Sequence, residues 1–109
     1  MTTLSSPLVA LRNLEQLYER GFRDRLTDTA LLRVASSQAA RDEAVLRDLE
    51  RDLSDLELEY DMPSEEFFQR WQAGEIADTA DFMDWNALYQ MACEVRERLE
   101  LLRGEAEAV

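Results

Sequence analysis

Glu94, Glu97 and Glu100 are the residues whose type and spacing come nearest to catalytic chemistry. Acids three positions apart on a helix share a face, where their oxygens could bind Mg²⁺. Arginines alternate with these glutamates, and such charge pairs are ordinary features of a solvated helix. No paired acidic motif on a second helix completes the site. Surface pairing is therefore the favoured interpretation, and no catalytic or metal-binding residue is predicted.

The other chemistry-bearing residue types exclude several kinds of site. Asp78, Asp81 and Asp84 recur every third residue, but the glycine-containing loop and distant glutamate of a calcium-binding hand are missing. The chain has one cysteine, Cys93, and no histidine, which excludes a Cys/His zinc site, an intrachain disulfide and a nucleophilic triad. We therefore expect no cofactor, no bound metal and no enzymatic activity.

Six of the nine aromatic residues fall within 23 positions of one another. Aromatic residues at helical spacing more often form a core than a binding site. One or two that remain exposed would nevertheless be typical of an interface hot spot. We predict that this cluster packs a short helix onto its neighbours and also contacts a partner; its members are Phe67, Phe68, Trp71, Phe82, Trp85 and Tyr89.

Asp42 interrupts an otherwise apolar helical stripe between Ala39 and Leu46. A charge in such a position destabilises the fold unless it is paired. The favoured interpretation is that Asp42 is hydrated or pairs with an arginine. The alternative makes Asp42 a register-setting group or an acceptor for an arginine of another protein, so it is kept among the candidate partner-binding residues.

Helices are the elements that must position these side chains. Three glycines and two prolines in 109 residues leave few turns, and apolar residues recur at spacings of three and four. Two apolar seams follow this spacing and are expected to pack together: Leu32, Ala35, Ala39, Leu46, Leu49, Leu53, Leu56 and Tyr60, and Trp85, Leu88, Ala92, Val95, Leu99 and Leu102. The sequence predicts an all-α single domain: a helical bundle or antiparallel coiled-coil hairpin of three long helices plus one short helix. The expected helices span 7–26, 29–60, 64–73 and 81–103, with a disordered tail at 104–109.

Local signals set the expected helix ends. Asp28 or Thr29 is expected to cap the second helix, and Ser64 the third. Pro63 should end the second helix, because the residue before a proline avoids the helical region. Gly74 should close the third helix.

The net charge of −12 is distributed unevenly. Residues 1–36 carry +1, residues 37–62 carry −6 and residues 63–109 carry −7. Such a field attracts basic proteins and repels phosphate and anionic lipid, so neither nucleic acid, for the C-terminal two thirds, nor a membrane is expected as a partner. With no signal-peptide pattern and no apolar run near the roughly 20 residues of a membrane span, a cytoplasmic location is expected.

Four segments together resemble a family of small helical proteins: RDEA at 41–44, EYDMPSEEF at 59–67, RWQAGE at 70–75 and DFMDW at 81–85. The resemblance, over roughly residues 10–103, is to antitoxin-like proteins of prokaryotic toxin-antitoxin loci. Asp61 stands where that pattern usually has Gly, and Asp84 where it usually has Glu. Both departures are mild, since Asp tolerates a turn and keeps the charge. The resemblance implies a non-enzymatic partner protein and carries over no catalytic residue.

The leading hypothesis is a non-enzymatic, antitoxin-like interaction module that binds a cognate basic, toxin-like protein through an acidic helical surface. One alternative is an all-helical, magnesium-dependent enzyme similar to nucleotide pyrophosphatases, using Glu94, Glu97 and Glu100. A second alternative is a structural coiled-coil adaptor, which shares the heptad pattern and lacks a specific basic partner.

A homodimer is also expected. The helix at 81–103 is too short to cover the apolar face of the helix at 29–60, and a small domain gains stability by enlarging its core. The predicted interface consists of Leu11, Leu14, Tyr18, Phe22, Leu32 and Leu46.

Overall fold

The structure, a computed structural model, describes residues 6–108 as four α-helices, with no strand in this range. The helices are α1 (Pro7–Glu19), α2 (Arg25–Tyr60), α3 (Ser64–Gln72) and α4 (Ala80–Ala108). The predicted all-helical class is confirmed, whereas the bundle or coiled-coil hairpin of three long helices stays a prediction. The chain divides into two compact units, unit 1 (Met1–Val34) and unit 2 (Ala35–Val109), and α2 contributes to both.

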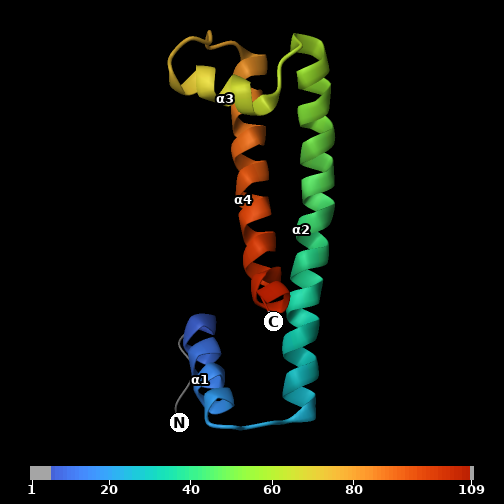
Figure 1. Ribbon diagram of the computed structural model, residues 1–109, viewed down its shortest axis with the longest axis vertical. Helices are drawn as coiled ribbons and strands as arrows, with labels where there is room; N and C mark the ends of the chain where they lie inside the picture. The colour runs from blue at the N-terminus through green and yellow to red at the C-terminus, as the bar shows by residue number, and fades with distance from the viewer. Residues whose placement is uncertain (1–5, 109) are drawn as a thin grey trace. The chain divides into compact units, whose positions relative to one another are not determined.

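Unit 1 is a hairpin of α1 and the first turns of α2 (Figure 1). Its first helix ends at Glu19 instead of continuing to about residue 26. Gly21 ends it by adopting a φ of 96°, which an L-residue rarely accepts. The N–H groups of Gly21 and Phe22 donate to carbonyls of the last turn at 3.0 Å each, in the arrangement of a Schellman motif. The chain therefore turns at Gly21, and α1 is shorter than the helix that the apolar spacing predicted.

Side-chain caps set both helix starts in unit 1. Ser6 caps α1, and its hydroxyl accepts a hydrogen bond at 3.3 Å from a backbone N–H of the first turn. Asp24 caps α2 by accepting hydrogen bonds from the backbone N–H (3.0 Å) and hydroxyl (2.6 Å) of Thr27. The expected cap at Asp28 or Thr29 is therefore wrong, because a better acceptor lies one turn earlier.

Tyr18 joins the two helices of unit 1. Its hydroxyl donates to the Asp28 carboxylate at 2.5 Å, and this hydrogen bond raises the pKa of Tyr18 to about 12. The ring of Phe22 meets the Tyr18 ring edge-on, with centroids 5.8 Å apart. Within residues 6–34, however, no side chain is buried. The described part of unit 1 therefore has a hydrogen-bonded hairpin and no core.

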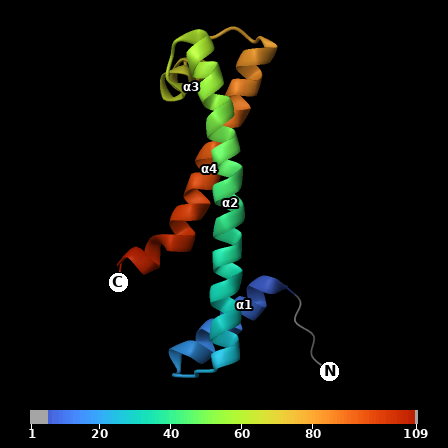
Figure 2. The same ribbon diagram turned by 90° about the vertical axis from the view of Figure 1, so that its right-hand side faces the viewer.

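In unit 2, α2 and α4 run in opposite directions, and α3 lies across the end where α2 finishes and α4 begins (Figures 1 and 2). At that end the Tyr60 hydroxyl donates to Asp81 at 2.6 Å. Further along the pair, Arg98 of α4 contacts Asp42 of α2 at 3.0 Å. From Asp42 to Tyr60 the chain advances along α2, while their partners on α4 go back from Arg98 to Asp81. Antiparallel packing requires this reversed order.

The core of unit 2 combines the apolar seams of α2 and α4 with one aromatic residue of α3. Phe67 and Trp85 are 1% and 0% exposed, and their rings stack with centroids 4.0 Å apart. Except for Phe67, the buried apolar residues all occupy predicted seam positions. The core residues are Leu49, Leu53, Phe67, Trp85, Ala92, Val95 and Leu99.

Two tight turns flank α3. Asp61 adopts a φ of 50° directly after α2, and Gly74 a φ of 76° directly after α3, where the sequence placed the helix end. Pro63, not Ser64, holds the N-cap position of α3. Ser64 is buried, and its hydroxyl accepts a hydrogen bond from the indole Nε1–H of Trp85 at 2.9 Å. The expected role of Ser64 as a cap is therefore wrong, because the indole takes its oxygen.

The last helix is longer than expected. α4 begins at Ala80 and continues to Ala108, so it includes most of the segment predicted as a disordered tail. Gly104 lies inside this helix without a positive φ. Within residues 6–108, no helix combines the length and apolar character needed to cross a bilayer.

Candidate partner-binding surface

The second half of α2 and the turn after it carry the densest charge of unit 2. Residues 48–61 include seven acids and a single arginine. Residues 94–103 of α4, in contrast, contain three acids and three arginines, so their net charge is zero. The acids of residues 48–61 therefore form a dense stretch on α2, while residues 63–109 together carry −7.

One set of α2 acids is used inside the chain. Glu43, Glu50 and Glu57 recur every seven residues on the flank that faces α4 and α3. Glu43 forms an ion pair with Arg103, and Glu50 pairs with Arg96 at 3.2 Å. Glu57 accepts a hydrogen bond from the backbone N–H of Ser64 at 2.8 Å, at the start of α3. These three carboxylates therefore help hold unit 2 together.

A second set of acids lies on the opposite flank of α2 and is exposed. The spacing of four, three and four residues places them in one row along the helix. We name this row the acidic flank: Asp48, Asp52, Asp55 and Glu59. Leu58, directly beside it, is 83% exposed, the highest value among the large apolar side chains described. A shallow depression of about 410 Å³ adjoins Leu58 and is lined also by Ser54 and Met62.

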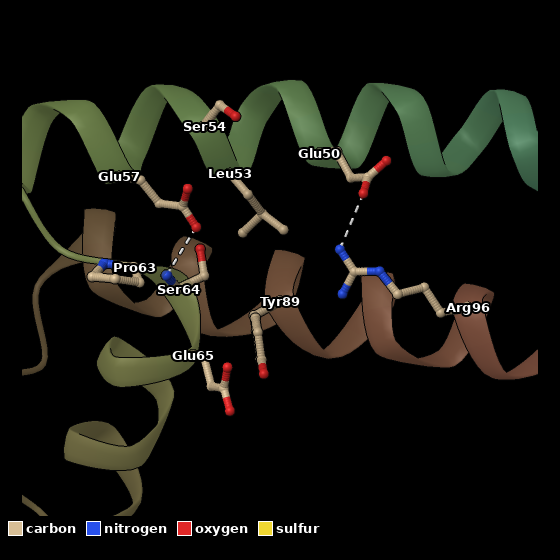
Figure 3. A pocket seen from close by; sticks show the side chains of 9 residues that line it. All are labelled: Glu50, Leu53, Ser54, Glu57, Pro63, Ser64, Glu65, Tyr89 and Arg96. Atoms are coloured by element: carbon tan, nitrogen blue, oxygen red, sulfur yellow. Dashed lines mark hydrogen bonds and ion pairs between the residues drawn. The ribbon is translucent and has the colours of Figure 1, made fainter.

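A cleft of about 330 Å³ lies between α2, α3 and α4 (Figure 3). Figure 3 shows three carboxylates around it, those of Glu50, Glu57 and Glu65, together with the guanidinium of Arg96. Tyr89 completes the polar lining, and burial, with smaller contributions from nearby groups, raises the pKa of its hydroxyl. The excess of carboxylates over cations makes the cleft suited to a positively charged side chain.

Two of the six predicted aromatic residues are buried and four are partly buried. Phe67 and Trp85 form the centre of the core, and Trp71, Phe82 and Tyr89 pack against it. Phe68 and Tyr89 have rings 4.9 Å apart. Tyr89 also lines the cleft. Phe67 and Trp85 are therefore core residues, while the other four keep part of their surface exposed.

Asp42 is buried, at 3% exposure, and both of its oxygens have partners in the chain. The guanidinium of Arg98 donates to them at 3.0 and 3.2 Å, and the Gln38 side chain donates at 3.1 Å. The Arg98 hydrogen bond holds the pKa of Asp42 below its usual value. This geometry favours pairing within the chain over a contact with another protein.

The residues of the predicted dimer interface lie in different environments. Leu11 and Leu32 are exposed, while Leu14 and Tyr18 are half-buried in unit 1. Leu46 packs against the core of unit 2. The structure thus gathers part of this set in unit 1 and uses Leu46 elsewhere.

The acids considered for metal binding are not gathered into a site. Across residues 6–108 no group of three or more acid, cysteine or histidine side chains is placed to hold a metal ion. Glu94, Glu97 and Glu100 are exposed on α4, and Asp81 accepts the Tyr60 hydroxyl hydrogen bond.

The sequence predicted neither the exposure of Leu58 nor the hydrogen bonds that Ser64 forms with Trp85 and Glu57. An isolated leucine between Glu57 and Glu59, outside the heptad seam, was the available signal for an exposed apolar residue. No sequence signal connects Ser64 with Trp85, which lies 21 residues away. Comparison with protein families, with curated proteins and with solved structures finds no match to the chain.

Proposed function

We propose that this chain is a non-enzymatic, antitoxin-like interaction module that binds a basic cognate protein through the acidic flank of α2. The observation that carries the proposal is the charge of residues 48–61, where seven acids accompany one arginine and four of the acids form an exposed row. A surface of this kind attracts a basic protein over long distances and accelerates its association.

The charge of unit 2 as a whole supports this choice of partner. Unit 2 has 20 acids and seven arginines, a net charge of −13. Five of those arginines already form ion pairs within the chain: Arg51, Arg70, Arg96, Arg98 and Arg103. The remaining acids outnumber the arginines that could neutralise them, so neutralisation must come from solvent cations or from another protein.

Leu58 gives the acidic flank an apolar anchor. Charged rims add mainly specificity and association rate, whereas buried apolar anchors supply much of the affinity. Leu58 and the depression beside it offer such an anchor, and the acids that line the depression are Glu57 and Asp61. We therefore propose a partner that presents an apolar side chain surrounded by arginines or lysines.

The packing of unit 2 suits it to present this surface rigidly. We propose that α2 and α4 pair as an antiparallel coiled coil, supported by the acids of α2 that recur every seven residues and contact Arg103 and Arg96. The exposed thiol of Cys93 is compatible with a reducing compartment, and a cytoplasmic location is part of the proposal.

The experiment begins with the product of the neighbouring gene, which the antitoxin-like resemblance makes the first candidate partner. It should be a small basic protein, and it should copurify with this chain when the two are coexpressed. Isothermal titration at increasing salt should show weakening affinity, because screening reduces the attraction between opposite charges. A neutral or acidic neighbour that does not bind would contradict the proposal.

Charge-neutralising variants locate the binding surface. The variant D52N/D55N/E59Q should lower affinity about tenfold or more, since several favourable charge contacts are lost together. The matched control is E94Q/E97Q/E100Q, which removes acids from the charge-balanced part of α4 and should change affinity much less. Equal losses in both variants would show that net charge alone, rather than the acidic flank, drives binding.

A further inference from the structure

Unit 1 has an apolar groove that the proposed function does not use. We name it the α1 groove; it has a volume of about 510 Å³ and is lined by Leu8, Leu11, Arg12, Leu14, Glu15, Tyr18 and Leu31. Leu8 and Leu11 are more than half exposed, at 54% and 56%. All of these residues belong to unit 1, so the groove is a feature of the α1–α2 hairpin itself.

The apolar surface of unit 1 is large for its size. Eight large apolar side chains are exposed within residues 6–34, and no side chain in that range is buried. Contiguous exposed apolar surface marks an interaction site, because its removal from water is favourable. The hairpin therefore needs an occupant for its groove in order to gain a core.

The charge of unit 1 distinguishes the occupant of the groove from the basic partner of unit 2. Unit 1 carries four acids and five arginines, a net charge of +1, against −13 for unit 2. A basic protein is attracted to unit 2 and gains no electrostatic attraction from unit 1. Two copies of unit 1, in contrast, are nearly neutral and can approach one another closely.

The charged residues of the α1 groove complement one another in a symmetric pair. Arg12 and Glu15 both line it, three residues apart on α1. If two α1 helices pack antiparallel about a two-fold axis midway between Asn13 and Leu14, Arg12 of each copy lies opposite Glu15 of the other. A two-fold interface requires such self-complementarity, because each patch meets its own copy. Opposite charges facing each other would flank the apolar contact.

We propose that a second copy of this chain occupies the α1 groove, through two-fold antiparallel pairing of the α1 helices. In this register Leu11 of each copy lies beside Leu14 of the other, and Leu8 lies beside Tyr18 of the other. Of the sequence-based dimer interface, Leu11, Leu14 and Tyr18 line the α1 groove, whereas Phe22 and Leu32 do not. Leu46 is also excluded, because it packs in the core of unit 2.

Sedimentation equilibrium of the full chain, from micromolar to millimolar concentration, tests the pairing. The mass should rise from 12.6 kDa toward twice that value as concentration increases. Leu11→Glu should remain monomeric, and Leu101→Glu, which changes a leucine of unit 2 that is 78% exposed, should associate like the unaltered chain. Because Leu11 is exposed, its replacement should leave the helical circular dichroism unchanged. A constant mass of 12.6 kDa, or association of Leu11→Glu equal to that of the unaltered chain, would overturn the proposal.

Charge reversal tests the antiparallel arrangement. Arg12→Glu and Glu15→Arg should each weaken self-association by roughly fivefold to tenfold, since two like-charge contacts replace two opposite-charge contacts. An equimolar mixture of the two variants should form a heterodimer, because every contact between copies then joins opposite charges. The mixture has the same total charge as two unaltered chains, so a change in net charge cannot explain recovery. A mixture that associates no better than either variant would overturn the antiparallel pairing.

Salt separates this interface from the proposed function. Added salt screens the repulsion between two chains of charge −12 and should strengthen or preserve the dimer. The same salt should weaken the complex with a basic partner. A dimer that dissociates as salt is added would contradict an apolar interface in unit 1. That result would not bear on the proposed binding of a basic partner by unit 2.

Discussion

Ser64 satisfies the one polar atom of the most deeply buried side chain in unit 2. Its hydroxyl accepts the hydrogen bond of the Trp85 indole N–H at 2.9 Å, while its own backbone N–H donates to Glu57. A buried indole without an acceptor would retain the cost of leaving water. A single residue, through its hydroxyl and its backbone N–H, thereby connects α2, α3 and α4.

Replacing Ser64 by alanine should destabilise the chain by about 1–3 kcal/mol, because the buried Trp85 N–H loses its acceptor. Urea unfolding followed by tryptophan fluorescence measures this difference. Ser54→Ala is a suitable control, since Ser54 is exposed on α2. Equal unfolding midpoints for the two variants would show that the indole hydrogen bond contributes little.

Asp42 makes the stability of unit 2 depend on pH. Arg98 lowers the pKa of the folded carboxylate, so its stabilising effect is present above the unfolded value of about 3.9 and is lost as pH falls through the folded pKa. Asp42→Asn should therefore be less stable than the unaltered chain at neutral pH, and the difference should shrink below about pH 4.

Urea titrations across that pH range give the two unfolding free energies. Asp48→Asn is the matched control, because Asp48 is exposed and pairs only with the exposed Arg51. Its difference from the unaltered chain should stay small at every pH. A difference for Asp42→Asn that persists undiminished in acid would contradict the ion-pair explanation.

At the scale of elements, the residues with a positive φ lie in the turns that follow the helices. They are Gly21, Asp61 and Gly74, each within two residues of a helix end. At Gly74 and Gly21 the residue type accommodates this conformation without steric cost. At Asp61 the side chain makes the same conformation unfavourable.

Asp61→Gly should stabilise the chain by about 0.5 kcal/mol. The left-handed conformation costs an L-residue roughly 1–2 kcal/mol, and glycine removes that cost while adding roughly 0.5–1 kcal/mol of unfolded-state entropy. Thermal unfolding should show a small rise in the midpoint temperature.

Two glycine variants test the same reasoning in opposite directions. Gly74→Ala should destabilise, although nothing within 4 Å would meet the new Cβ, because the φ of 76° is itself unfavourable. Gly104→Ala, inside α4 and without a positive φ, should be neutral or stabilising through helix propensity. Destabilisation by Asp61→Gly would mean that the Asp61 side chain contributes more than its backbone strain removes.

At the scale of the whole molecule, stability is divided unequally between the two units. The buried residues within the described range all belong to unit 2, and unit 1 has a hairpin without a core. Regions with few buried apolar contacts open at low free energy. We therefore expect α1 to be far less protected than α3 and α4 in the monomer.

Amide hydrogen exchange measures this division directly. In dilute solution the amides of α1 should exchange rapidly, and those around Phe67 and Val95 slowly. If the α1 helices pair, protection of α1 should rise with protein concentration while that of the unit 2 core stays constant. Equal protection of α1 and α4 at the lowest concentration would contradict the division into a stable and a labile unit.

The sequence by itself determined the helical class, the apolar seams and the turn at Gly74, because periodicity and backbone preferences act over a few residues. Leu49, Leu53, Ala92 and Val95 were identified as core positions by their spacing alone. Charge was equally accessible, since the excess of acids is a property of composition.

Only the tertiary structure decided which polar and aromatic residues remain available. Asp42 is neutralised by Arg98, 56 residues away, and Ser64 is directed to Trp85 instead of a cap. Phe67 became core while Leu58, with no seam partner, stayed exposed. The physical reason is common to all four. Burial and pairing depend on contacts between distant segments, and local spacing fixes only the face of a helix on which a residue lies, not what covers that face.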